Sequence, residues 1–192
     1  GQNEGIYQLK SPAIRRLITK LSPSILEELI FVLAYYHSNR LNKKIFNSFI
    51  NRKYGYERIN YFFKEFEKPL KPILESTHGL IIYQEQIMEI LHIVGGFSLE
   101  KSDYVRRELG KKKLKAILKY ESEFSQGALK KGFTLINAVS LFQYMVECVV
   151  DCSLKSHFVR EAMITYKTAY LKYHYSIEFM STFQKMNWTN LL

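Results

Sequence analysis

The sequence predicts a mainly helical protein, and three observations lead to this prediction. All four prolines fall within the first 72 residues, so the remainder of the 192-residue chain contains none. Glycine is sparse, and no Asn-Gly or Asp-Gly pair offers a two-residue hairpin turn. The remaining punctuation consists of residues that begin and end helices. We therefore expect an all-α fold with at most a short strand near 80–83.

The first helix starts are marked by serines. Ser11 and Ser22 each precede a proline, and this order suits a capping residue followed by the first helical position. Ser24 and Glu27 also fit a capping box, so the start of the second helix remains open between two registers.

Apolar residues at helical spacing, bounded by caps and glycines, define the other expected helices. They are 25–36, 42–53, 86–94, 99–109, 111–131, 134–150, 155–174 and 176–185. Ser98 is the expected cap of the helix at 99–109. Residues 69–79, which contain two prolines, predict a turn-rich connector.

A net charge of +10 on a chain of this size predicts a polyanionic partner: nucleic acid, nucleotide or an anionic membrane surface. The charge is densest in one cluster, which consists of Arg106, Arg107, Lys111, Lys112, Lys113 and Lys115. A helix that starts near Lys111 would add backbone donors for an anion. Most basic runs are solvated faces, but the density beside Gly110 favours phosphate binding. We expect these side chains to share one exposed surface and to stay outside intramolecular ion pairs.

Two weaker groups complete the candidates. The first is Lys155, Ser156 and His157, at the start of the longest expected helix. A basic side chain and a hydroxyl at that position suit an anion or the edge of a nucleobase. The second is a polar run that enters a helix, Tyr83, Gln84, Glu85 and Gln86. These residues could position a substrate or fix a turn through side-chain hydrogen bonds, and the sequence leaves both interpretations open.

Groups typical of a complete enzyme are missing. The only aspartates, Asp103 and Asp151, have no paired acidic neighbour, and there is no Ser-His-Asp grouping, glycine-rich phosphate loop or metal-ligand spacing. We therefore predict a binding element with no catalytic residue and no metal site. Cys148 and Cys152, four apart and expected on one helix face, predict no disulfide and suit a reducing cytoplasm. No apolar run approaches the roughly 18 residues of a membrane span.

Ordered motifs between about 5 and 180 resemble the alpha subunit of bacterial DNA polymerase III, the C-family replicative polymerase. The motifs are GIYQLKSP at 5–12, FINRKYG at 49–55, PILESTHG at 72–79, IIYQEQIM at 81–88, GFSL at 96–99, RR at 106–107, GKKK at 110–113, KSH at 155–157, TAYLK at 168–172 and EFM at 178–180. Several motifs in the family's order make the resemblance highly specific.

The resemblance implies that residues 1–192 are a helical fingers domain, with the palm-to-fingers junction at about 1–10. Such a domain closes over the incoming deoxynucleoside triphosphate (dNTP), while the aspartates that hold Mg²⁺ lie in an upstream palm. The parent would carry out template-directed DNA synthesis with DNA primer-template, dNTP and other holoenzyme subunits as partners. We expect the isolated chain to be inactive.

The nucleotide-binding residues implied by the resemblance are Arg106, Arg107, Lys111, Lys112, Lys113, Lys155 and His157. Their roles would be charge neutralisation and positioning rather than proton transfer.

Two loops depart from the family's pattern. His37-Ser38-Asn39-Arg40 stands where the family has Arg-Pro-Gly-Pro, and residues 149–154 replace a glycine-containing aromatic loop. These changes keep an alternative open, a non-catalytic DNA-binding helical module derived from a polymerase. A plain helical interaction domain ranks last, because it makes every motif a coincidence.

Overall fold

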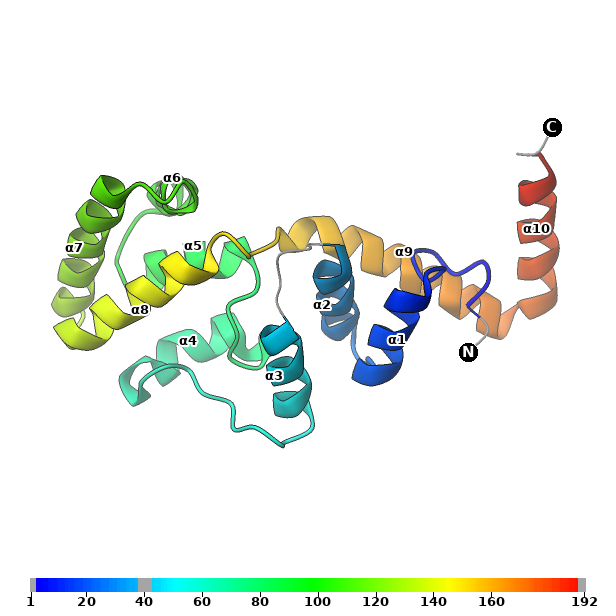
Figure 1. Ribbon diagram of the computed structural model, residues 1–192, viewed down its shortest axis with the longest axis horizontal. Coiled ribbons are helices and arrows are strands. Elements are labelled where there is room, and N and C mark those ends of the chain that lie inside the picture. The colour runs from blue at the N-terminus through cyan, green and yellow to red at the C-terminus, as the bar shows by residue number, and fades with distance from the viewer. Residues whose placement is uncertain (1–2, 38–42, 190–192) are drawn as a thin grey trace. The chain divides into compact units, whose positions relative to one another are not determined.

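The computed structural model describes residues 3–37 and 43–189, with side chains described as far as Met186. This part of the chain forms ten α-helices and two short 3₁₀ helices (Figure 1). The 3₁₀ helices are η1 (Lys64–Phe66) and η2 (Glu75–Thr77). The helices fall into two compact units, one formed by residues 1–37 and 156–192 and the other by residues 38–155. The predicted mainly helical fold is confirmed.

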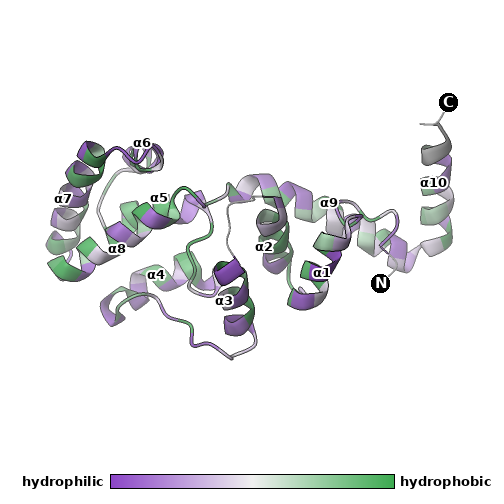
Figure 2. Cartoon of the chain, in the orientation of Figure 1, coloured by the Kyte–Doolittle hydropathy of each residue, from purple (hydrophilic) through white to green (hydrophobic). Residues whose placement is uncertain are grey.

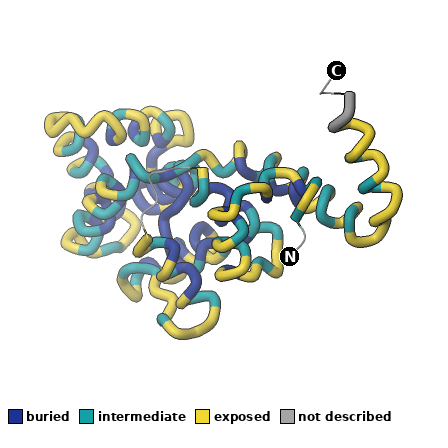
Figure 3. The backbone as a smooth tube through the Cα atoms, turned by 45° about the vertical axis from the view of Figure 1, so that its right-hand side comes forward, coloured by how far each residue is buried: buried dark blue, intermediate teal, exposed yellow. Residues whose placement is uncertain are grey.

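The first unit consists of α1 (Pro12–Leu21), α2 (Leu26–His37), α9 (Lys155–His174, from residue 156 onward) and α10 (Ser176–Thr189). Helices α1 and α2 pack against each other. Apolar residues colour α2 green along most of its length in Figure 2, and its residues 30–34 are all buried. Helix α10 is exposed over most of its described length (Figure 3).

The segment before α1 is tied to α9 by polar contacts. The Tyr7 backbone N–H donates to Thr168 Oγ1 at 3.1 Å, and Gln8 Nε2 donates to Glu161 Oε2 at 3.1 Å. Lys172 Nζ donates to the Glu4 carbonyl at 2.6 Å. Residues at the two ends of the sequence therefore belong to one unit.

The second unit consists of α3 (Lys43–Lys53), α4 (Glu67–Leu74), α5 (Gln84–Ile93), α6 (Leu99–Gly110), α7 (Leu114–Lys130) and α8 (Leu135–Cys148). Its core is one apolar cluster drawn from α4 to α8 and the loops between them. Helices α7 and α8 pack together, as do α5 and α6. The start of α5, the end of α6 and the chain after α8 lie around the same region.

Two of the predicted serine caps are confirmed. Ser11 Oγ accepts from the Ala13 N–H at the start of α1, and Ser98 Oγ accepts from the Lys101 N–H at the start of α6. Ser22 instead ends α1, in a left-handed conformation with its N–H bonded to the Ile18 carbonyl. Of the two registers left open for the second helix, the start at Ser22 is therefore wrong, because Ser22 terminates the preceding helix.

The connector predicted over 69–79 is wrong for residues 69–74, because α4 passes through both prolines, whereas residues 75–79 form η2 and a turn. Pro69 is the third residue of α4, where the backbone N–H has no intrahelical partner and its absence costs nothing. Pro72 gives up one hydrogen bond of the last turn. Buried Leu70, Ile73 and Leu74 hold the helix onto the core despite this loss.

The described residues contain no strand, which agrees with the expectation of at most a short one near 80–83. The extended segment makes a single parallel bridge between Tyr83 and Ser153. The Ser153 N–H donates to the Ile82 carbonyl, and the Gln84 N–H donates to the Ser153 carbonyl. Across 3–37 and 43–189, we also find no helix long and apolar enough to cross a membrane.

Candidate nucleic-acid interface

The two arginines of α6 share one carboxylate. Arg106 Nη2 lies 2.6 Å from Asp103 Oδ1, and Arg107 Nη2 lies 2.7 Å from Asp103 Oδ2. The Arg106 guanidinium, followed by that of Arg107, holds the pKa of Asp103 below its usual value. The expectation that these arginines avoid intramolecular ion pairs is wrong, because Asp103 lies one helical turn before both of them.

Although they share one partner, the two arginines lie in different environments. The Arg106 side chain is 17% exposed and its buried Nε has no hydrogen-bond partner in the described chain, whereas the Arg107 side chain is 65% exposed. Neighbours on a helix point about 100° apart, which explains the difference. Arg107 is therefore the guanidinium that an anion from solvent can reach.

Both arginines line a cavity of about 460 Å³. The other lining residues come from the start of α5, the end of α6 and the loop after α8; they are Gln84, Gly110, Val149, Val150 and Asp151. Charge alone grouped the arginines in the sequence, whereas residues 149–151 were singled out only as part of the loop 149–154 that departs from the family's pattern.

The three lysines after Gly110 form a turn rather than the start of a helix, which corrects the predicted helix start near Lys111. Lys112 has a φ of 52°, and α7 begins at Leu114 with Lys113 as its cap residue. All three are exposed. Lys111 Nζ lies 2.5 Å from Glu108 Oε1, which raises the pKa of the lysine, so it too departs from the expectation of unpaired cations. In the described chain we find no ion pair for Lys112 or Lys113.

The polar run at the start of α5 fixes the backbone, which is one of the two interpretations that the sequence left open. Buried Gln86 accepts from the N–H groups of Ile82 and Tyr83 at 2.8 and 2.9 Å, and its Nε2 donates to Thr77 Oγ1 at 2.8 Å. Gln84 Nε2 donates to the Cys152 carbonyl at 3.1 Å. These bonds hold the extended segment against the loop that lines the cavity.

Glu85 and Lys155 meet at the end of that loop. Glu85 Oε2 accepts from the Lys155 backbone N–H at 3.0 Å, at the start of α9. The Lys155 ammonium lies 5.7 Å from the centroid of the buried Tyr83 ring. Glu85 therefore supplies an acceptor for the helix terminus, and Tyr83 is a packing residue.

His157 belongs to the first unit, and it is not among the residues that line this cavity. Its exposed ring meets Phe158 edge-on at 4.9 Å. Of the departure at 37–40, only His37 is described, and its ring stacks on Phe158 at 6.2 Å. Residues 38–40 lie outside the described residues.

The two thiols are free, as expected. Cys148 ends α8 and Cys152 follows beyond it, so they do not share one helix face. Burial raises the pKa of Cys148 to about 11 and raises that of Cys152 as well. Both side chains remain neutral thiols at physiological pH.

Fold and site together describe a helical domain with a cavity lined by two arginines. The family model for the bacterial DNA polymerase III alpha subunit finger domain matches residues 1–132. The chain therefore belongs to the finger-domain family of bacterial DNA polymerase III alpha subunits.

Individual relatives agree with this membership. The chain is 40% identical over 181 residues to DNA polymerase III subunit alpha of Campylobacter jejuni. It is 38% identical over 182 residues to that of Buchnera aphidicola from Schizaphis graminum, and 35% identical over 181 residues to that of Escherichia coli K12. Each alignment covers 94% of this chain but only 15–16% of the relative.

Proposed function

We propose that this chain is the fingers portion of a DNA-directed DNA polymerase and that its arginine-lined cavity binds the phosphates of the incoming dNTP. The observation that carries the proposal is that one cavity is lined both by Arg106, which is held by Asp103 and mostly buried, and by the exposed Arg107. Family membership makes template-directed DNA synthesis the reaction in which such a site would serve.

Asp103 gives the two arginines different tasks. It accepts from Arg106 with one oxygen and from Arg107 with the other, so Arg107 can leave for a phosphate while Asp103 stays paired with Arg106. A guanidinium suits this role because its planar array of donors matches phosphate oxygens bidentately. Arg106 would then hold Asp103 and the cavity wall in place during the exchange.

Lys112 and Lys113 extend positive charge beyond the cavity. They lie in the turn that directly follows Gly110, a residue of the cavity lining. As point charges on long stems, lysines suit the DNA backbone, which needs neutralisation without fixed geometry. We assign this turn to primer-template phosphates.

Mg²⁺ does not fit the part of the chain that the structure describes, where no group of three or more His, Cys, Asp or Glu could hold a metal ion. We therefore derive no metal-dependent step from these residues. In our proposal the Mg²⁺-binding aspartates belong to another region of the polymerase, and this chain binds and positions phosphates.

Arg107→Ala in the polymerase subunit that contains this chain tests the proposal. Loss of a hydrogen bond to a charged group costs about 1.5–3 kcal/mol, so we expect the KM for dNTP to rise by about ten- to a hundredfold in primer extension. Arg16→Ala on α1 removes the same charge from an exposed position and should leave the KM unchanged.

An unchanged KM in Arg107→Ala would overturn the dNTP role. If the unsubstituted subunit binds primer-template but extends no primer, the alternative of a non-catalytic DNA-binding module holds instead.

A further inference from the structure

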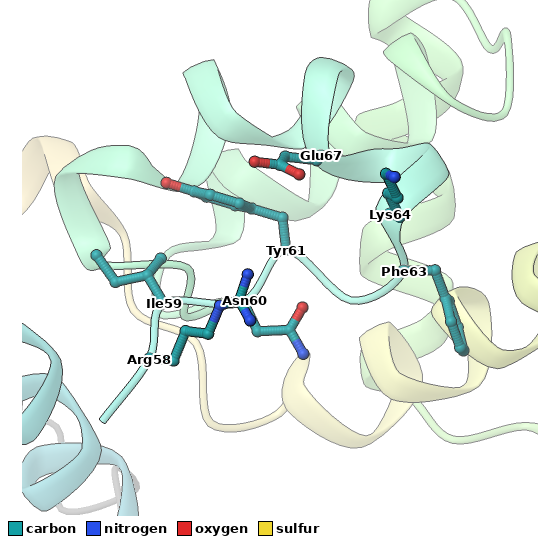
Figure 4. A pocket seen from close by; sticks show the side chains of 7 residues that line it. All are labelled: Arg58, Ile59, Asn60, Tyr61, Phe63, Lys64 and Glu67. Carbon is teal, nitrogen blue, oxygen red and sulfur yellow. The ribbon is translucent and has the colours of Figure 1, made fainter. Parts of the chain in front are cut away.

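A second cavity, of about 510 Å³, lies between the segment 58–64 and the first turn of α4 (Figure 4). Its lining combines cations, aromatic rings and an amide, in the residues Arg58, Ile59, Asn60, Tyr61, Phe63, Lys64 and Glu67. The volume lies within the range of about 300–1,000 Å³ typical of small-ligand sites. No sequence motif drew attention to these residues.

The segment that carries these side chains is fixed at both ends. Before it, Arg52 Nε lies 2.7 Å from Glu57 Oε1, and Arg52 Nη1 donates to the His78 carbonyl at 3.0 Å. After it, Glu65 Oε1 accepts from Thr134 Oγ1 at 2.9 Å and from Asn137 Nδ2 at 2.8 Å. The segment that lines the cavity is therefore held in place by contacts on both sides.

Phe62 anchors the middle of the segment. Its ring meets that of Tyr144 on α8 at 4.6 Å in an edge-to-face contact, and its φ is 73°. A left-handed backbone is unfavourable for an aromatic residue, and such strain gathers at binding sites. With Phe62 turned toward α8, its neighbours Tyr61 and Phe63 are left to line the cavity.

The polar side chains of the lining are available to a ligand. Within the described residues, no hydrogen bond or ion pair engages the side chains of Arg58, Asn60 or Lys64, and all three are exposed. In Figure 4, Arg58 and Asn60 extend to one side of the Tyr61 ring, and Glu67 lies on the other. With Glu67 opposite two cations, the lining carries a net charge of +1.

We propose that this cavity seats one nucleotide of single-stranded DNA. Arg58 and Lys64 would neutralise its phosphate, and an aromatic face of Tyr61 or Phe63 would stack on the base. Stacking requires a base that is free of its duplex neighbours, which selects a single strand. A net charge of +1 suits one backbone phosphate rather than a triphosphate, so the ligand differs from the dNTP of the proposed function.

Two variants separate the charge from the stacking. Arg58→Ala removes an exposed, unpaired cation, and Tyr61→Leu keeps an apolar side chain but removes the ring. We expect each to weaken binding of the full chain to a fluorescein-labelled dT₁₂ strand about tenfold, measured by fluorescence anisotropy. Arg58→Ala should also make the log–log salt slope shallower by about 0.7, whereas Tyr61→Leu should leave the slope unchanged.

A control variant and a control ligand show whether a loss of binding is specific to the cavity and to single-stranded DNA. Arg16→Ala should keep its affinity for dT₁₂ within about twofold of the unsubstituted chain. Either cavity variant should bind a 12-base-pair duplex nearly as well as the unsubstituted chain does. Unchanged dT₁₂ binding in Arg58→Ala, or equal losses for strand and duplex, would overturn the inference. It does not require Arg107 to bind dNTP, so the two proposals fail independently.

Discussion

At the scale of single residues, Asp103 decides what the arginine pair can do. Adjacent residues on a helix cannot face the same way, so the expectation of one exposed surface holds for Arg107, which is 65% exposed, but not for Arg106, which is 17% exposed. The common partner of the two arginines, Asp103, was not predicted from the sequence, where the absence of an acidic neighbour only argued against a metal site. Spacings of three and four on one helix were the signal that could have revealed this partner.

The lowered pKa of Asp103 predicts a pH-dependent contribution to stability. A carboxyl whose pKa falls on folding stabilises the protein above its unfolded pKa, and the contribution disappears as the pH falls through the folded pKa. Asp103→Asn should therefore lower the free energy of unfolding at pH 7 by about 0.5–1 kcal/mol, the size expected for helical ion pairs near the surface. Urea denaturation should show the deficit shrinking toward pH 3. An equal deficit at both pH values would contradict the ionic account.

At the scale of elements, two glycines bring α7 close to the end of α5. A Cβ at Gly127 would overlap the carbonyl oxygen of Gly95, and a Cβ at Gly95 would press on the Phe124 ring. The sequence marked Gly95 only as a helix terminator and gave Gly127 no structural role. The close approach depends on residues 32 apart in the chain, which no local pattern reports.

Gly127→Ala should therefore destabilise the protein although alanine favours helices. The expected loss is about 1–3 kcal/mol in urea denaturation, because the added methyl group forces α7 away from Gly95. Gly110→Ala is the matched control, because it ends α6 and has no atom within 4 Å of an added Cβ. That change should be neutral or stabilising by up to about 1 kcal/mol. A Gly127→Ala protein as stable as Gly110→Ala would show that the two backbones do not meet.

Local signals predicted most helices, and tertiary contacts decided the exceptions. Ser98 capped its helix as expected because a cap requires only neighbouring residues. Pro69 was wrongly assigned to a connector, because a proline in the first turn of a helix cannot be distinguished from a proline in a connector until the helix start is known. The role of Gln86 depended on acceptors and donors in three other segments, so the sequence could only leave it open.

At the scale of the whole molecule, the chain divides at 37/38 and 155/156, and the sequence showed no boundary there. The second unit is inserted within the first, and the junction at 155/156 falls inside the continuous helix α9. No run of Pro, Gly or Ser marks such a junction. The division into two compact units does not test whether residues 1–192 form one fingers domain, so that stays a prediction.

The net charge of +10 predicts weak, sequence-independent binding of this chain to duplex DNA, dominated by phosphate contacts. Lys112 and Lys113 should contribute most at the turn after α6, because they are exposed and Lys111 is already matched by Glu108. The double variant Lys112→Ala, Lys113→Ala should weaken binding about equally for every sequence and make the log–log salt slope shallower by about 1.8. Lys111→Ala alone should change the slope less than either single substitution at 112 or 113.

Fluorescence anisotropy with a labelled primer-template and an unrelated duplex, across a salt series, measures these effects. The double variant Lys10→Ala, Arg16→Ala removes the same charge from exposed positions in the other unit and serves as the control. If both double variants flatten the slope equally, the turn has no special part in binding and only the total charge matters. Binding that ignores salt or strongly prefers one duplex would contradict the electrostatic account altogether, because released counterions are its driving force.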